Sequence, residues 1–209
     1  MNFHFFSSSA GSSLSTMGRM VRLLLGVMAA ILLVACAHPI SIEGKTLPER
    51  SAQPSPKKAA YVLSAADRQK EVTTAGGGGD KVSYYPYRDF ERALRSALAS
   101  VYADVSVLPS LSDASAIRES GAALIFVPEI STTSYSSSIL TWPPTMFTLS
   151  LTLNVFDAQA APIARLRVNG SGNAVWEEFK GDFGLAGRRA VEVAAKALVE
   201  EIRRNEKLL

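Results

Sequence analysis

Within the segment from Met146 to Phe156, apolar and polar residues alternate from Phe147 to Val155, and this alternation constrains the fold more than any other feature of the chain. In an extended strand it places one row of side chains on the core and the other row in water. After a turn over 157–162 the alternation returns, with Ala164, Leu166 and Val168 as apolar positions. The two segments therefore predict an antiparallel hairpin with a polar outer face.

Two other segments have apolar residues at helical spacing. The first runs from Tyr87 to about Ala103, and Pro86 stands near its first helical position, where a missing amide hydrogen costs nothing. The second ends at about Arg204, and Asp182 is its predicted N-cap. Both helices would bury one apolar stripe and leave the opposite face in water.

Three short apolar runs predict further strands over 59–64, 105–108 and 122–127, and a short helix is expected over 114–120. The run over 122–127 is continuously apolar, as in a central strand that is buried on both faces. Packing the helical stripes on these strands gives an α+β fold. We predict a single mixed or largely antiparallel sheet of four to five strands, with two main helices packed on one face.

The glycine run from Gly76 to Gly79 stands beside a lysine and suggests a phosphate-binding loop. The pattern does not fit, because Asp80 precedes Lys81 and Val82 follows it, where such a loop needs glycine before the lysine and serine or threonine after it. We therefore predict a flexible loop here.

The amino-terminal part contains an uncharged apolar run over 23–36, which follows Arg19 and Arg22 and ends at Cys36, the single cysteine of the chain. The run is too short for a membrane-spanning helix, which needs about 20 apolar residues. Basic residues before it and small residues at its end are typical of a cleavable signal peptide. A serine-rich stretch precedes it, so Met17 or Met20 is a candidate for the true start.

The segment Leu33-Val34-Ala35-Cys36 resembles the lipobox of bacterial lipoprotein precursors. The resemblance implies that residues 1–35 are removed and that Cys36 becomes the fatty-acylated first residue, which anchors the protein to a membrane. Two alternatives stay open: an uncleaved anchor helix with a buried structural cysteine, or an ordinary signal peptide with a coincidental cysteine.

Residues 36–58 would then comprise the lipidated cysteine and a flexible tether, because the segment is polar and interrupted by four prolines. Residues 59–209 would form a single periplasmic α+β domain. Arg19 and Arg22 leave with the signal, so 20 basic residues remain against 19 acidic ones. This balance gives no electrostatic reason to expect a nucleic-acid partner.

The predicted domain contains no histidine and no cysteine, since His38 lies in the tether. This excludes histidine-dependent triads, cysteine nucleophiles and zinc sites built from these residues, so we predict no metal, no cofactor and no enzyme activity. A carboxylate-dependent hydrolase of cell-wall glycan is the alternative, since two acids at a suitable separation could cleave glycosidic bonds. Its nominal candidates are Glu129, Asp157, Glu177 and Glu178.

The best candidate for an interaction surface is the hydroxyl-rich segment 130–144, which we expect to link two strands. Exposed aromatic side chains are common at partner interfaces and at membrane surfaces. The alternative is that Leu140 and Trp142 fold back and cap the core. The predicted partner-binding residues are Tyr135, Ile139, Leu140 and Trp142.

The order of predicted elements over 60–204 resembles small periplasmic domains of the TolB amino-terminal and CsgG type, which also occur in envelope lipoproteins of the YajG kind. The resemblance implies a non-catalytic binding or assembly accessory with an envelope protein as partner. By resemblance to lipoprotein sorting, Ala37 in place of aspartate favours the periplasmic face of the outer membrane over the inner membrane. A carrier of a small apolar ligand between sheet and helices is a further alternative. The sequence does not indicate an oligomeric state.

Overall fold

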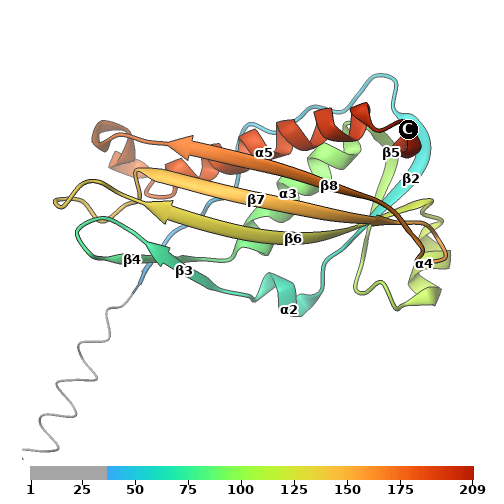
Figure 1. Cartoon of the computed structure of the whole chain (residues 1–209), viewed down its shortest axis with the longest axis horizontal. Coiled ribbons are helices and arrows are strands. Elements are labelled where there is room, and N and C mark those ends of the chain that lie inside the picture. The colour runs from blue at the N-terminus through green and yellow to red at the C-terminus, as the bar shows by residue number, and fades with distance from the viewer. Residues whose placement is uncertain (1–36) are drawn as a thin grey trace, which may run out of the picture. The chain divides into compact units, whose positions relative to one another are not determined.

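The computed structural model describes residues 37–209, which are coloured in Figure 1. The predicted signal peptide, the lipobox and Cys36 lie outside the described residues. Every helix over residues 37–209 is too short or too polar to span a bilayer.

The main sheet has five strands in the order β5–β2–β6–β7–β8. Strand β2 pairs in parallel with β5 and β6, whereas β6, β7 and β8 pair antiparallel, so the sheet is mixed as predicted. The predicted hairpin is confirmed, with Leu151 opposite Val168 and both facing the core. The strands are β2 (Ser55–Val62), β5 (Tyr102–Leu108), β6 (Leu124–Tyr135), β7 (Met146–Phe156) and β8 (Pro162–Asn173).

Two long helices, α3 (Pro86–Ala99) and α5 (Leu185–Arg204), cover one face of this sheet, as Figure 1 shows. The predicted N-cap at Asp182 is wrong, because Asp182 instead ends a 3₁₀ helix, η1 (Trp176–Gly181), and α5 begins three residues later. The short helix α4 (Ala114–Ser120) is confirmed. It contributes Ile117 to a smaller apolar cluster with Ala60 and Ile125 on the other face of the sheet.

A second sheet makes the single-sheet prediction wrong. It has the order β1–β4–β3 and consists of β1 (His38–Pro39), β4 (Lys81–Tyr84) and β3 (Val72–Ala75). The tyrosine hydroxyl of Tyr84 donates to Thr132 Oγ1 on β6 at 2.6 Å, so the two sheets are joined by side chains rather than by a backbone ladder. In Figure 1 this small sheet lies beside β6, at the end from which residue 37 enters the fold.

The segment expected to be a flexible tether is packed against the domain instead. The side chain of Ile42 is fully buried, and its amide donates to the buried carboxylate of Asp89 at 3.1 Å. Further along, the Ser96 hydroxyl donates to the carbonyl of Pro48 at 2.7 Å. The sequence pattern was too short to show this, because alternation at Ile40 and Ile42 alone does not identify a strand.

The short helix α2 (Ala65–Arg68) is attached to α3 by a two-point ion pair. The Arg68 guanidinium donates to the Glu91 carboxylate at 2.8 and 2.6 Å, and the Tyr61 hydroxyl donates to it at 3.1 Å. The hydrogen bond from Arg68 is the main reason why the pKa of Glu91 lies below its ordinary value.

We expect Glu91→Gln to lower the free energy of unfolding by about 1 kcal/mol at neutral pH, a modest effect because solvent screens this partly exposed pair. The folded-state pKa is lowered, so the stabilisation is present above the ordinary Glu pKa of about 4.3 and is lost as the pH falls. Urea unfolding from pH 3 to 8 should show the two proteins converging in acid. Glu200→Gln, which breaks an exposed pair with Arg204, is the matched control, and an equal pH-dependent difference there would contradict the prediction.

Candidate functional site

Exposed apolar side chains gather at the end of the molecule where residue 37 enters. Ile139 and Leu140 are the most exposed, at 83% and 90% of their full accessible surface. They lie on the loop between β6 and β7, which projects from the left of Figure 1. We call this surface the apolar end, and its exposed residues are Tyr135, Ile139, Leu140, Met146, Val175, Trp176 and Phe183.

Backbone pairing brings the segments of the apolar end together. Tyr135 at the end of β6 lies opposite Met146 at the start of β7, and Met146 lies opposite Asn173 near the end of β8. Just beyond Asn173, the Ala174 amide donates to the carbonyl of Thr145 at 3.0 Å. The residues that follow β8 therefore stand beside the β6–β7 loop.

The glycine run holds this loop in place, contrary to the flexible loop that we predicted. The amide of Gly77 donates to the carbonyl of Trp142 at 2.8 Å, and the amide of Gly78 donates to that of Ser138 at 3.0 Å. A Cβ at Gly77 would overlap the carbonyl oxygen of Thr141. Glycine is required here because two backbones approach too closely for any side chain.

Trp142 lies at the junction of three segments. Its ring stacks on His38 of β1 with 4.3 Å between centroids, and it meets Phe183, just before α5, at 4.7 Å. Trp142 is only partly exposed, whereas Tyr135, Ile139 and Leu140 are exposed. The sequence left open whether Leu140 and Trp142 are exposed or fold back onto the core. In the structure Trp142 folds back onto the domain, whereas Leu140 is exposed.

Four members of this surface were not predicted from the sequence: Met146, Val175, Trp176 and Phe183. Their placement depends on the pairing of β8 with β7 and on the turn before α5. The one signal in the sequence was the break in alternation after Asn173, where two large apolar residues follow each other.

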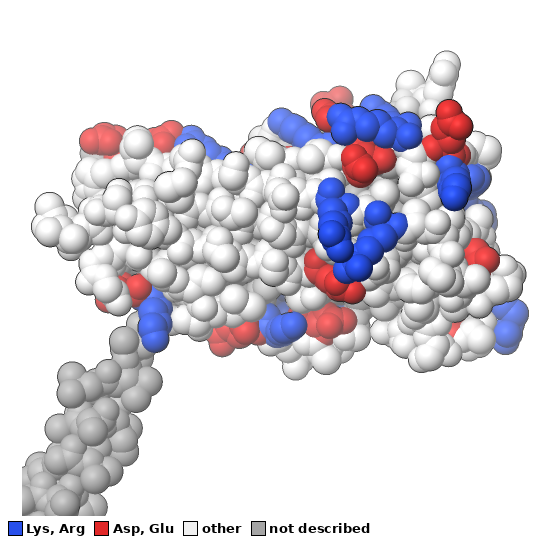
Figure 2. Space-filling model, viewed as in Figure 1, with Lys and Arg blue, Asp and Glu red and all other residues white. Residues whose placement is uncertain are grey.

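The two halves of the apolar end differ in charge: the β6–β7 loop carries none, whereas the half that follows β8 is flanked by Glu177, Glu178 and Asp182, of which the last two pair with basic side chains. No charged residue occurs from Ile130 to Phe156. In Figure 2 the projecting tip itself is white, and charged atoms border this end above and below the tip. His38 contacts Asp80 at 3.7 Å at the side of this surface.

The four nominal catalytic carboxylates are spread over the fold. Glu129 on β6 accepts from Asn154 at 2.6 Å and pairs with Arg165 at 3.6 Å. It lines a hollow of about 190 Å³ that no second carboxylate lines. Asp157 accepts from the amides of Gln159 and Ala161, which is the ordinary role of aspartate in a turn.

Glu177 and Glu178 both belong to η1 and are exposed. Glu178 pairs with Arg189 of α5 at 2.6 Å, and this hydrogen bond lowers the pKa of Glu178 to about 2. A carboxylate with so low a pKa stays ionised near neutral pH and does not serve as a general acid.

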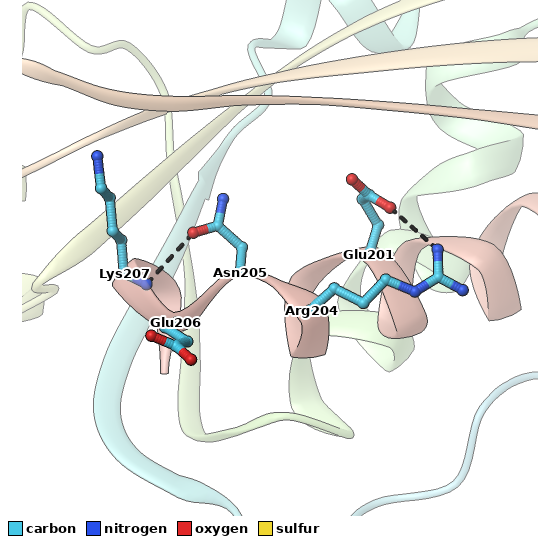
Figure 3. A pocket seen from close by; sticks show the side chains of 5 residues that line it. All are labelled: Glu201, Arg204, Asn205, Glu206 and Lys207. Carbon is cyan, nitrogen blue, oxygen red and sulfur yellow. Dashed lines mark hydrogen bonds and ion pairs between the residues drawn. The ribbon is translucent and has the colours of Figure 1, made fainter.

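A larger hollow of about 410 Å³ lies at the carboxyl-terminal end of α5 (Figure 3). In it Glu201 pairs with Arg204 at 3.4 Å, and Glu206 points away from Glu201. The hollow therefore presents one paired acid and mixed charge rather than two converging carboxylates. Its lining residues are Glu201, Arg204, Asn205, Glu206 and Lys207. Over residues 37–209, no three His, Cys, Asp or Glu side chains are grouped so that they could hold a metal ion.

Neither a protein-family model nor a curated protein matches the sequence. Among solved structures, a Xanthomonas campestris protein of family DUF330 is similar at 10% identity and a TM-score of 0.47, over 74% of this chain and 88% of that one. The PelC dodecamer of Paraburkholderia phytofirmans is similar at 11% identity and 0.39, over 72% and 92%. A candidate lipoprotein of Caulobacter crescentus is similar at 15% identity and 0.32, over 68% and 85%. At these TM-scores the likenesses carry no inference about this chain.

Proposed function

We propose that this chain is a lipid-anchored protein of the bacterial cell envelope, attached through acylated Cys36 at the periplasmic face of the outer membrane. It acts there as a non-catalytic binding or assembly accessory, and the apolar end is its contact surface. Tyr135, Ile139 and Leu140 make the contact, and Trp142 holds their loop.

The observation that carries the proposal is the stacking of His38 on Trp142. His38 is the second residue after Cys36, so a lipid on Cys36 would start within two residues of a residue that contacts the apolar end. Since β1 is paired with β4 and residues 37–48 are packed, no long tether separates the two. Because the lipid anchor and the apolar contact surface lie at the same end of the domain, we infer that the protein functions in contact with the membrane surface.

We expect Cys36→Ser to abolish fatty-acid labelling of the protein and to move it from the membrane fraction to the soluble fraction of the envelope. The reason is that a serine hydroxyl cannot form the thioether that carries the acyl chains. Metabolic labelling with an alkyne fatty acid, followed by fractionation, measures both effects in cells that express the full chain.

Ala37→Asp is the matched control, because it leaves the cysteine in place. By resemblance to lipoprotein sorting, it should keep the label and shift the protein towards the inner membrane. An unlabelled wild-type protein, or a serine variant that stays in the membrane fraction, would contradict the proposed anchor.

A further inference from the structure

We infer that the apolar end lies on the surface of a phospholipid bilayer, with Ile139 and Leu140 inserted between the lipids. The inference rests on the proposed function for the attachment of the chain, and it goes further by naming the bilayer itself as the occupant of the contact surface.

The described chain begins beside the apolar end. Residues 38–39 form the outer strand of the small sheet, and His38 contacts the Trp142 ring. A chain extends by at most about 3.6 Å per residue, so Cys36 reaches no more than about 7 Å from His38. An acyl chain on Cys36 therefore enters the bilayer beside the apolar end, and the membrane surface must pass close to this end of the domain.

The chemistry of the β6–β7 loop suits a lipid surface. The tip itself carries two aliphatic side chains, Ile139 and Leu140. Along the chain away from the tip, serine and threonine hydroxyls come next on both sides, and then Tyr135 on one side and Trp142 on the other. This order matches a membrane interface, where aliphatic groups enter the acyl region and aromatic and hydroxyl groups lie at the headgroups. The absence of charge from Ile130 to Phe156 means that no ion has to be desolvated when the tip enters.

The tip of the loop is held in a fixed shape. Hydrogen bonds from Gly77 and Gly78 secure both sides of the loop, and Trp142 is clamped between His38 and Phe183. Ile139 and Leu140 therefore remain outside in the folded state, although burying such side chains stabilises a protein by about 1.5 kcal/mol or more each. A rigid loop that keeps two aliphatic side chains in water is explained if the lipid bilayer buries these side chains when the protein is bound to the membrane.

A bilayer also fits the shape better than a protein does. Protein interfaces concentrate binding in pockets filled by aromatic or arginine anchors, whereas here the most exposed residues stand at a projecting tip. Insertion of one tip adds a second contact to the lipid anchor, and two contacts fix the orientation of the domain on the membrane.

The chain contains an internal probe, because its two tryptophans, Trp142 and Trp176, both belong to this end. The full chain, purified in its acylated form, is reconstituted into vesicles of phosphatidylethanolamine and phosphatidylglycerol with or without brominated acyl chains. Bromine quenches tryptophan on contact. We expect a loss of tryptophan fluorescence in brominated vesicles relative to ordinary ones, and co-flotation of the protein with both.

The double variant Ile139→Asp/Leu140→Asp should still co-float through its anchor but lose the quenching. Leu209→Asp is the matched control, because Leu209 is an exposed apolar residue at the opposite end of Figure 1, and it should leave the quenching unchanged.

The outcomes separate the two proposals. A wild-type protein that does not co-float shows that the proposed anchor is wrong. A protein that co-floats without quenching shows that the anchor is right and that the apolar end does not touch lipid, which overturns the inference. A photocrosslinker at Leu140 that captures an envelope protein rather than phospholipid in cells overturns it as well.

Discussion

Gly170→Ala is expected to lower the free energy of unfolding by about 3 kcal/mol, at the upper end of what overpacking costs. Gly170 lies on β8 where α5 crosses it. A Cβ there would overlap the carbonyl oxygen of Ala190 and come within 2.8 Å of the Cβ of Ala194. Both neighbours belong to the buried side of α5, so relief requires the whole helix to move away from the sheet.

Urea unfolding of the wild type and the variant measures the effect as a shift in midpoint at constant slope. Gly181→Ala is the matched control, since a Cβ at Gly181 has no atom within 4 Å, and it should change stability by less than about 0.5 kcal/mol. Equal stability of the Gly170 variant and the wild type would show that α5 is not seated on β8 as described.

An element could be predicted from the sequence where its interactions join residues close together along the chain, and not where they join residues far apart. The hairpin from β7 to β8 was predictable because period-two alternation is long and the turn is short. The helix α3 was predictable because five apolar positions at helical spacing lie within it. Its predicted end near Ala103 was wrong, because the helical spacing continues by coincidence through Val101 and Tyr102, and Tyr102 begins β5. The start of α5 was not, because η1 ends at Asp182 through a local turn that imitates an N-cap signal.

The second sheet could not be predicted because its strands have two to four residues each. It depends on pairing His38 with Val82, far away in the sequence, and on side-chain bonds such as Tyr84 to Thr132. The same long-range contacts convert the expected tether into packed chain, since Ile42 finds its partner in Asp89. Prolines indicated only that this segment is not helical.

The candidate site was predictable in part. Aromatic and aliphatic residues in a hydroxyl-rich loop pointed to Tyr135, Ile139 and Leu140, which the structure exposes. The second half of the surface follows β8 and precedes α5, and it joins the first half only through the register of β7 with β8. The stacking of His38 on Trp142 has no local signal at all, although it determines where the proposed anchor meets the domain.

Phe147→Ala is expected to lower the free energy of unfolding by about 3 to 5 kcal/mol, as the truncation of a buried phenylalanine does. Phe147 is 1% exposed and lies where the two sheets and α5 meet. Its ring packs edge-on against Tyr84 of β4 at 5.2 Å, and Gly187 of α5 lies directly beside it. The variant therefore leaves a cavity between the small sheet and the helix that positions Phe183.

Met146→Ala, one residue earlier on the same strand, is the matched control, because Met146 is 52% exposed and faces away from the core. Its effect should stay below about 0.5 kcal/mol. Hydrogen exchange shows where the variant is destabilised. Relative to the wild type, Phe147→Ala should accelerate exchange at the amides of Gly77 and Gly78 more than at those of β5, because the small sheet carries the glycine run that holds the loop. Uniform acceleration over the whole chain, or none at Gly77, would mean that Phe147 does not couple the small sheet to the apolar end, and the fixed shape of the tip would then need another cause.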